Sequence, residues 1–142
     1  MKTLRLFFFV VALFLFMLFL EAWRIINAPA DYSRDSPWGD YKVESVWVFT
    51  PLLPSFNLGY MRFVKKDSGA AYRSPFFNQD ALEMGVYESQ ESIGMTSMTY
   101  SKIDHRIELH MNGWCPVWLN YLVSNVDYSS TGDGGCGIPK SD

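Results

Sequence analysis

A continuous apolar run near the start of the chain dominates the hydrophobic pattern. All fifteen residues from Leu6 to Leu20 are apolar, and thirteen of them are Leu, Phe or Val. Each of these three residue types favours membrane insertion by roughly 0.3 to 0.6 kcal/mol. Extended to Ile26, the segment is about 31 Å long as a helix, which is sufficient to cross a bilayer core of about 30 Å. The pattern therefore predicts a signal-anchor or signal-peptide helix over residues 1–26.

Charges in front of this run predict its orientation. Lys2 and Arg5 precede the apolar residues, and no acidic residue does. Because cations beside a spanning segment stay on the cytoplasmic side, we expect the N-terminus in the cytoplasm. The rest of the chain then faces the periplasm or the outside of the cell. We therefore expect a single-pass protein of the inner (cytoplasmic) membrane.

The residues after the run leave two outcomes open for this helix. Residues 28–30 read Ala-Pro-Ala, the small-x-small form at which a signal peptide is cut, so cleavage after Ala30 would give a secreted or periplasmic protein. Against cleavage, ten residues separate the end of the apolar run at Leu20 from the cleavage point after Ala30, which is a long spacer. Glu21 and Arg24 share a helix face and can pair near the interface, where Trp23 is also favoured. We take the retained anchor as the main interpretation and cleavage as the alternative.

A polar stretch follows over residues 27–40, rich in Pro, Asp and Ser and without an apolar period. This composition is typical of a linker. We expect it to hold the following domain off the membrane. Trp38 is its one large apolar residue and a candidate to dock the linker onto the domain.

Alternation of apolar and polar positions begins at residue 41 and predicts a strand over residues 41–49. In this strand Tyr41, Val43, Trp47 and Phe49 share one side, which we expect to be buried throughout. The opposite side starts polar and becomes apolar, so a second layer is expected to cover the end of the strand.

Two further patterns follow in the first half. Residues 58–65 alternate again and predict a strand, and residues 66–69 (Lys-Asp-Ser-Gly) supply a turn. Residues 76–85 differ, because Asn78 suits a helix cap and Gly85 suits a helix end. One or two helical turns are predicted there.

The second half carries the strongest strand signal. Residues 93–103 are rich in Thr, Tyr, Ile and Ser, and residues 105–111 alternate with Ile107 and Leu109 on one face. Asn112-Gly113 follows, and this pair predicts a two-residue type I′ hairpin because both positions tolerate positive φ.

That hairpin would pair Met111 with Trp114 and Ile107 with Trp118. A competing interpretation starts a helix at Pro116, since proline is favoured in a first helical turn. The period of residues 116–124 does not separate strand from helix, and we take the strand as the primary prediction.

The elements add up to a mainly β fold, with α+β as the variant. We expect the N-terminal helix over residues 1–26, the linker over 27–40, one small, mostly antiparallel β-sheet domain with a short helix over 41–128, and a glycine-rich tail over 129–142. The exported part is long enough for one domain and too short for two.

Two cysteines occur, Cys115 and Cys136. In an oxidising compartment, the default prediction is a disulfide that contributes on the order of 3 kcal/mol by closing a loop of about twenty residues. A zinc site is the competing interpretation, since the predicted hairpin places His110 opposite Cys115. Only three ligands are available to it, so we predict no metal and no other cofactor.

Charge and composition narrow the class of partner. Residues 31–142 hold nine Lys or Arg against fourteen Asp or Glu, a net charge of −5, and the one adjacent cation pair, Lys65-Lys66, precedes Asp67. Nucleic acid binding needs clustered cations, so we exclude it. No nucleophile elbow or paired-carboxylate motif stands out, so no catalytic residues are predicted.

Aromatic residues are the most informative candidates for function. The same 112 residues contain five Phe, eight Tyr and four Trp, more than a small sheet can bury. Since Tyr and Trp dominate protein-binding hot spots, we predict Trp114, Trp118 and Tyr121 as binding residues. The expected function is that of a membrane-anchored, non-catalytic envelope protein that binds another envelope or exported protein, as an inhibitor, immunity-type or accessory subunit. A small exported hydrolase or metal-dependent enzyme is the alternative.

Overall fold

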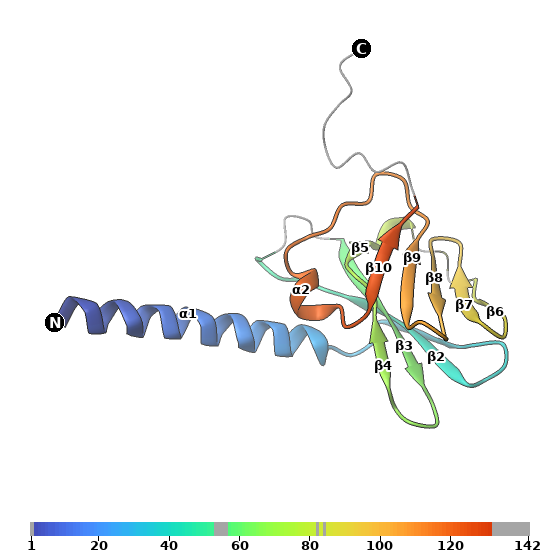
Figure 1. Cartoon of the computed structure of the whole chain (residues 1–142), viewed down its shortest axis with the longest axis horizontal. Helices are drawn as coiled ribbons and strands as arrows, with labels where there is room; N and C mark the ends of the chain where they lie inside the picture. The colour runs from blue at the N-terminus through green and yellow to red at the C-terminus, as the bar shows by residue number, and fades with distance from the viewer. Residues whose placement is uncertain (1, 53–56, 82, 84, 132–142) are drawn as a thin grey trace, which may run out of the picture.

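The computed structural model describes residues 2–52, 57–81, 83 and 85–131. An N-terminal helix, α1 (Lys2–Ile26), leads into a domain of two five-stranded sheets (Figure 1). The fold class predicted from the sequence is confirmed: an apolar helix precedes a mainly β, mostly antiparallel domain that includes a short helix.

The first sheet has the strand order β1-β2-β3-β4, and β5 also pairs with β3. All of its pairs are antiparallel. Its strands are β1 (Tyr32–Asp35), β2 (Tyr41–Trp47), β3 (Leu58–Lys65), β4 (Ala71–Arg73) and β5 (Phe77–Asn78).

The second sheet has the order β10-β9-β8-β7-β6, with a parallel β9–β10 pair and antiparallel pairs elsewhere. Its strands are β6 (Tyr87–Glu88), β7 (Ser92–Met95), β8 (Met98–Ser101), β9 (Arg106–Leu109) and β10 (Asp127–Ser130). A 3-10 turn, η1 (Gln79–Ala81), and a short helix, α2 (Asn120–Val123), complete the described elements.

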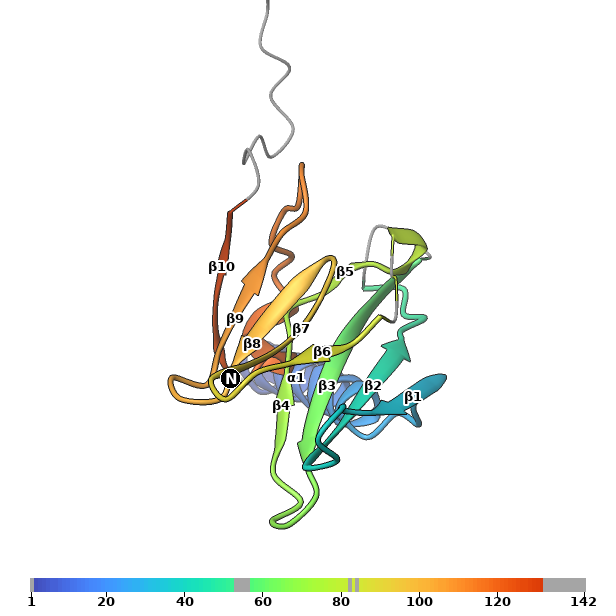
Figure 2. The ribbon, with the colours of Figure 1, turned by 90° about the vertical axis from the view of Figure 1, so that its right-hand side faces the viewer.

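Two apolar clusters cover the two faces of the first sheet, because successive side chains of a strand point to opposite faces. One cluster lies between the sheets, which face each other in Figure 2. Its buried residues are Tyr41, Val43, Met61, Phe63, Phe77, Ile93, Met95, Met98, Tyr100, Ile107 and Leu109. The other cluster joins the opposite face to α1 and α2, and its buried residues are Ile25, Val46, Val48, Tyr60, Phe76, Leu119 and Val123.

The predicted strand over residues 41–49 is present as β2, but the predicted burial of its end is wrong. Tyr41 and Val43 are buried between the sheets, whereas Trp47 and Phe49 are exposed. The second sheet covers only the first part of this face. The second layer expected on the opposite face exists, and α1 with α2 provides it by covering Val46.

The predicted continuous strand over residues 93–103 is wrong. Thr96 and Ser97 form a two-residue turn, so β7 folds back on β8 with Met95 opposite Met98. When β7 folds back on β8, the backbone N–H and C=O groups of each strand pair with those of the other. A single long strand would need another strand for these hydrogen bonds.

The predicted hairpin at residues 112–113 is also wrong. A type I′ turn needs positive φ at both residues, and Gly113 has a φ of 69° whereas Asn112 has no positive φ. Because β10 occupies the edge of β9 that the hairpin would have used, residues after Gly113 have no strand to pair with. The alternative for residues 116–124 holds: helical turns start at Val117 and end in α2.

Smaller differences affect three other predicted segments. Part of the predicted linker is β1, which pairs with β2. The predicted helix over residues 76–85 is reduced to η1, where the Asn78 Oδ1 atom accepts a hydrogen bond from the Asp80 N–H at 2.9 Å, as expected of a cap. The predicted tail begins inside β10, and its residues 132–142 lie outside the described residues.

Candidate interaction surfaces

The last turn of α1 is built into the domain. Ile25 is 1% exposed and packs in the cluster beneath the first sheet. The Tyr60 hydroxyl donates a hydrogen bond to the Ile25 carbonyl at 2.9 Å, and the same carbonyl accepts the Ala28 N–H at 3.2 Å at the end of the helix. The Arg62 guanidinium reaches the carbonyls of Ile26 and Ala28 at 3.3 and 3.4 Å. The helix and the domain are therefore one folded unit.

A buried carboxylate holds Arg62 in this position. The Arg62 Nε atom lies 2.6 Å from Glu44 Oε2, and the Lys42 ammonium lies 3.0 Å from Glu44 Oε1. Burial by itself raises the pKa of Glu44, but hydrogen bonds and charge from Lys42 and Arg62 outweigh burial and hold that pKa below its usual value.

Exposed aromatic side chains lie on the last turns of α1, beside them at Phe49, and next to or on α2, which packs against α1. Trp23 lies on the helix itself, and Phe49 follows β2, where its carbonyl accepts a hydrogen bond from Arg24 at 2.7 Å. On the side of α2, Trp118 is 48% exposed and Tyr121 is 87% exposed.

Leu122 of α2 completes this surface, because it lines an apolar groove of about 350 Å³ against α1. The helix contributes Leu15, Leu18, Phe19, Ala22, Trp23 and Ile26 to the groove. We call Trp23, Phe49, Trp118, Tyr121 and Leu122 the junction collar.

The structure does not bring the three predicted binding residues together. Trp118 and Tyr121 belong to the junction collar. Trp114 instead packs against the core between the sheets, where its Nε1–H donates to the Phe76 carbonyl at 2.7 Å and its ring meets Tyr128 edge to face. Trp114 therefore contributes to packing.

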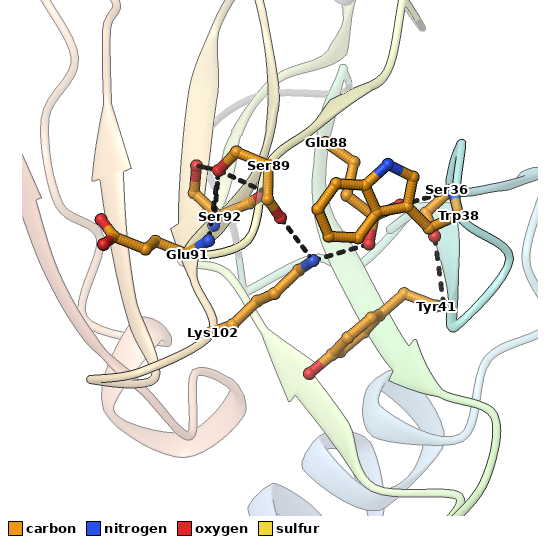
Figure 3. A network of polar contacts seen from close by, with 8 residues as sticks. All are labelled: Ser36, Trp38, Tyr41, Glu88, Ser89, Glu91, Ser92 and Lys102. Carbon is orange, nitrogen blue, oxygen red and sulfur yellow. Dashed lines mark hydrogen bonds and ion pairs between the residues drawn. The ribbon is translucent and has the colours of Figure 1, made fainter.

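The opposite end of β2 presents a different aromatic residue, Trp38. About 20 Å of extended strand separates Tyr41 from Trp47, so the turn before β2 lies on the side of the domain away from α1 (Figure 1). The Trp38 indole is 53% exposed, yet its backbone N–H donates to Glu88 Oε2 at 2.8 Å. The Lys102 ammonium lies 4.6 Å from the indole centroid, within cation–π range (Figure 3).

A buried ion pair underlies Trp38. Lys102 Nζ lies 2.7 Å from Glu88 Oε1, and the side chains are 13% and 0% exposed. The same ammonium donates to the Ser89 carbonyl at 2.8 Å and faces the Tyr41 ring (Figure 3). Two hydrogen bonds and two ring contacts thus hold the ammonium in place, so the pair fixes Trp38.

The carboxylate of this pair stays charged. Burial alone would raise the pKa of Glu88, but hydrogen bonds from Lys102, the Trp38 backbone and Ser36 outweigh burial and hold the pKa below its usual value. We call Trp38, Lys102 and Glu88 the distal cluster.

Sequence reasoning found only part of the distal cluster. The predicted docking of Trp38 onto the domain is confirmed by its contacts with Glu88 and Lys102. Lys102 and Glu88 lie fourteen residues apart and give no local signal, because the sheet that aligns β6 with β8 brings them together.

The candidate metal ligands have other contacts. His110 is bonded through its two ring nitrogens to the hydroxyls of Thr99 and Thr131, both at 3.0 Å. Among the residues that the structure describes, no group of three His, Cys, Asp or Glu side chains is placed to hold a metal. Cys115 is not a free thiol, and the predicted disulfide stays a prediction because Cys136 lies outside the described residues.

Of the described helices, α1 alone is long and apolar enough to cross a membrane, over Thr3–Ile26. No family model, curated protein or solved structure matches the chain.

Proposed function

We propose that this chain is a single-pass membrane protein that keeps α1 as its anchor and binds another protein of the cell envelope through its β-rich domain. The domain faces the periplasm or the cell exterior, and the N-terminus is cytoplasmic. The observation that carries the proposal is that the last turn of α1 belongs to the core of the domain.

This observation supports retention of the helix over cleavage. Cleavage after Ala30 would remove Ile25 from the core and expose the apolar face that it covers. It would also take away the carbonyl that Tyr60 bonds and the two carbonyls that Arg62 reaches, leaving buried donors to find other partners. A leader peptide that is discarded contributes no such contacts to the mature fold.

The distal cluster supports a protein partner. Tryptophan is among the residue types enriched at binding hot spots, and a side chain whose conformation is fixed before binding loses less entropy when it binds. Trp38 meets both conditions, because the Lys102–Glu88 pair holds its backbone and its ring. The turn before β2, which carries Trp38, lies on the side of the domain away from α1, and Trp38 is 53% exposed there, so a protein in the exported compartment can reach it.

Fractionation and intact mass test the anchor. We expect the full-length mass, with all residues of α1, in membranes that resist alkaline extraction. A soluble species that begins at Asp31 would overturn retention.

Photo-crosslinking in cells tests the partner. A photoreactive phenylalanine analogue replaces Trp38 in one strain and exposed Asn112 in a control strain. Asn112 belongs to a turn outside the distal cluster. We expect a discrete protein adduct from position 38 and none from position 112. Equal adducts, or none at either position, would contradict a partner surface at Trp38.

A further inference from the structure

The length of α1 indicates which residues near its C-terminal end lie at the outer boundary of the membrane. If Arg5 marks the cytoplasmic boundary, a hydrocarbon core of about 30 Å ends about 20 residues later, near Ile25. The domain does not start beyond that level. Phe49 is bonded through its carbonyl to Arg24, and Leu122 lies in the groove with Leu15 and Phe19. Parts of the domain therefore lie at the depth of the outer boundary of the membrane.

The exposed side chains at this depth include the residue types that are favoured at the membrane boundary. Val117 to Val123 form helical turns that bury Leu119, Asn120 and Val123, so the remaining face carries Trp118, Tyr121 and Leu122. Trp and Tyr are favoured at headgroup level because their rings are apolar and their N–H and O–H groups are polar. The domain thus exposes Trp118 and Tyr121 on the helical segment that packs against the spanning helix.

The apolar groove beside α1 is also suited to lipid. Its walls are almost wholly aliphatic and aromatic, and one wall is the membrane-inserting helix itself. A groove that continues from such a helix opens onto lipid acyl chains, which need no specific partner to fill it. The uninterrupted apolar run from Leu6 to Leu20 is only about 22 Å long, which is less than the thickness of the hydrocarbon core. Leu122 and the aromatic residues extend this apolar band.

We infer that the junction collar is a lipid-binding surface that inserts into the headgroup–acyl boundary of the outer leaflet and seats the domain on the membrane in one orientation. This inference rests on the proposed retention of α1. The domain would then lie directly on the membrane, whereas the sequence predicted that a linker over residues 27–40 holds it off the membrane. The domain then presents the distal cluster away from the bilayer.

Tryptophan quenching in vesicles tests the inference on the full-length protein. The purified chain is reconstituted in phosphatidylcholine–phosphatidylglycerol vesicles, with acyl chains either plain or brominated near the headgroup. Trp118→Phe removes a reporter from the collar, so we expect the quenched fraction of the fluorescence to fall. Trp38→Phe, a matched control with similar exposure, removes a distal reporter, so the quenched fraction rises.

A second pair of variants adds a reporter instead of removing one. Both parent residues are exposed tyrosines, Tyr121 in the collar and Tyr87 in β6. Tyr121→Trp adds quenched fluorescence, and Tyr87→Trp adds unquenched fluorescence. Equal quenching within both pairs in vesicles that retain the protein after alkaline extraction would overturn the collar and leave the anchor standing. The same result is expected if the groove binds a partner protein instead of lipid. Extraction of the chain from the vesicles would overturn the anchor and the collar together.

Discussion

The two ends of the domain expose aromatic side chains to a similar degree and hold them in opposite ways. Trp118 at the junction collar is 48% exposed and Trp38 in the distal cluster is 53% exposed. Trp23 and Leu122 of the collar line an apolar groove between α1 and α2, whereas a buried ion pair supports Trp38. Exposure alone therefore does not separate a surface suited to lipid from one suited to protein. We expect the groups next to each surface to make that distinction.

The largest expected effect comes from breaking the ion pair of the distal cluster. Glu88→Ala leaves the Lys102 ammonium without its carboxylate in a site that is only 13% exposed. Removing one partner of a buried pair costs about 3–5 kcal/mol, because an uncompensated charge stays buried. We expect that loss in the free energy of unfolding, measured by denaturant titration of the full chain in detergent.

Glu91→Ala is the matched control for Glu88→Ala. Glu91 is an exposed glutamate three residues further on, and surface substitutions of this kind change stability by no more than about 0.5 kcal/mol. Equal losses from the two variants would show that the pair does not support the distal cluster.

At the junction, the corresponding test removes packing instead of charge. Ile25→Ala truncates a side chain that is 1% exposed, and such truncations cost about 2–5 kcal/mol. Ile103→Ala changes an isoleucine that is 67% exposed and is expected to cost less than about 0.5 kcal/mol. Thermal or denaturant unfolding of the domain in detergent compares the two. If Ile25→Ala is as mild as its control, α1 is only tethered to the domain and is not part of its core.

Acid is expected to weaken both ends through Glu88 and Glu44. Each has its pKa lowered in the folded protein, Glu88 by Lys102 and Glu44 by Lys42 and Arg62, against the effect of burial. A lowered pKa means that the carboxylate stabilises the fold above the usual glutamate value, about pH 4.3, and that this contribution is lost as the pH falls through the folded-state pKa.

Unfolding measured between about pH 5 and pH 3 tests this dependence. We expect stability to fall with decreasing pH, with a shallower slope in Glu88→Gln and in Glu44→Gln than in the parent chain. Glu91→Gln, at an exposed position, should keep the parent slope. If stability depends on pH with the same slope in all three variants as in the parent chain, neither buried carboxylate contributes to acid sensitivity.

Local patterns in the sequence predicted the elements whose signal is complete within a few residues. The predicted strand over residues 58–65 coincides with β3, and the alternation of Ile107 and Leu109 places both in the core as expected. Both patterns reflect one buried face of one strand. The apolar run that became α1 is equally local.

Features that depend on distant partners were not predictable in this way. The short apolar run that ends in α2 fits strand and helix equally, and the occupation of β9 by β10 decides between them. The same holds for the junction, where Tyr60 and the carbonyl of Ile25 lie 35 residues apart. No flanking charge or cleavage motif encodes that contact, which is one of the contacts that support our proposal of a retained anchor.

The smallest expected effect tests that contact directly. Tyr60→Phe keeps the ring in its cluster and removes only the hydroxyl that donates to the Ile25 carbonyl at 2.9 Å. We expect a loss of about 0.5–1.5 kcal/mol in unfolding free energy, the usual net contribution of one hydrogen bond. Tyr121→Phe removes a hydroxyl from a residue that is 87% exposed and should leave stability unchanged. Because Ile25→Ala reports packing and Tyr60→Phe reports the end of the helix, losses in both variants would tie α1 to the domain by two independent interactions. A neutral Tyr60→Phe would leave packing and the Arg62 hydrogen bonds to hold the junction.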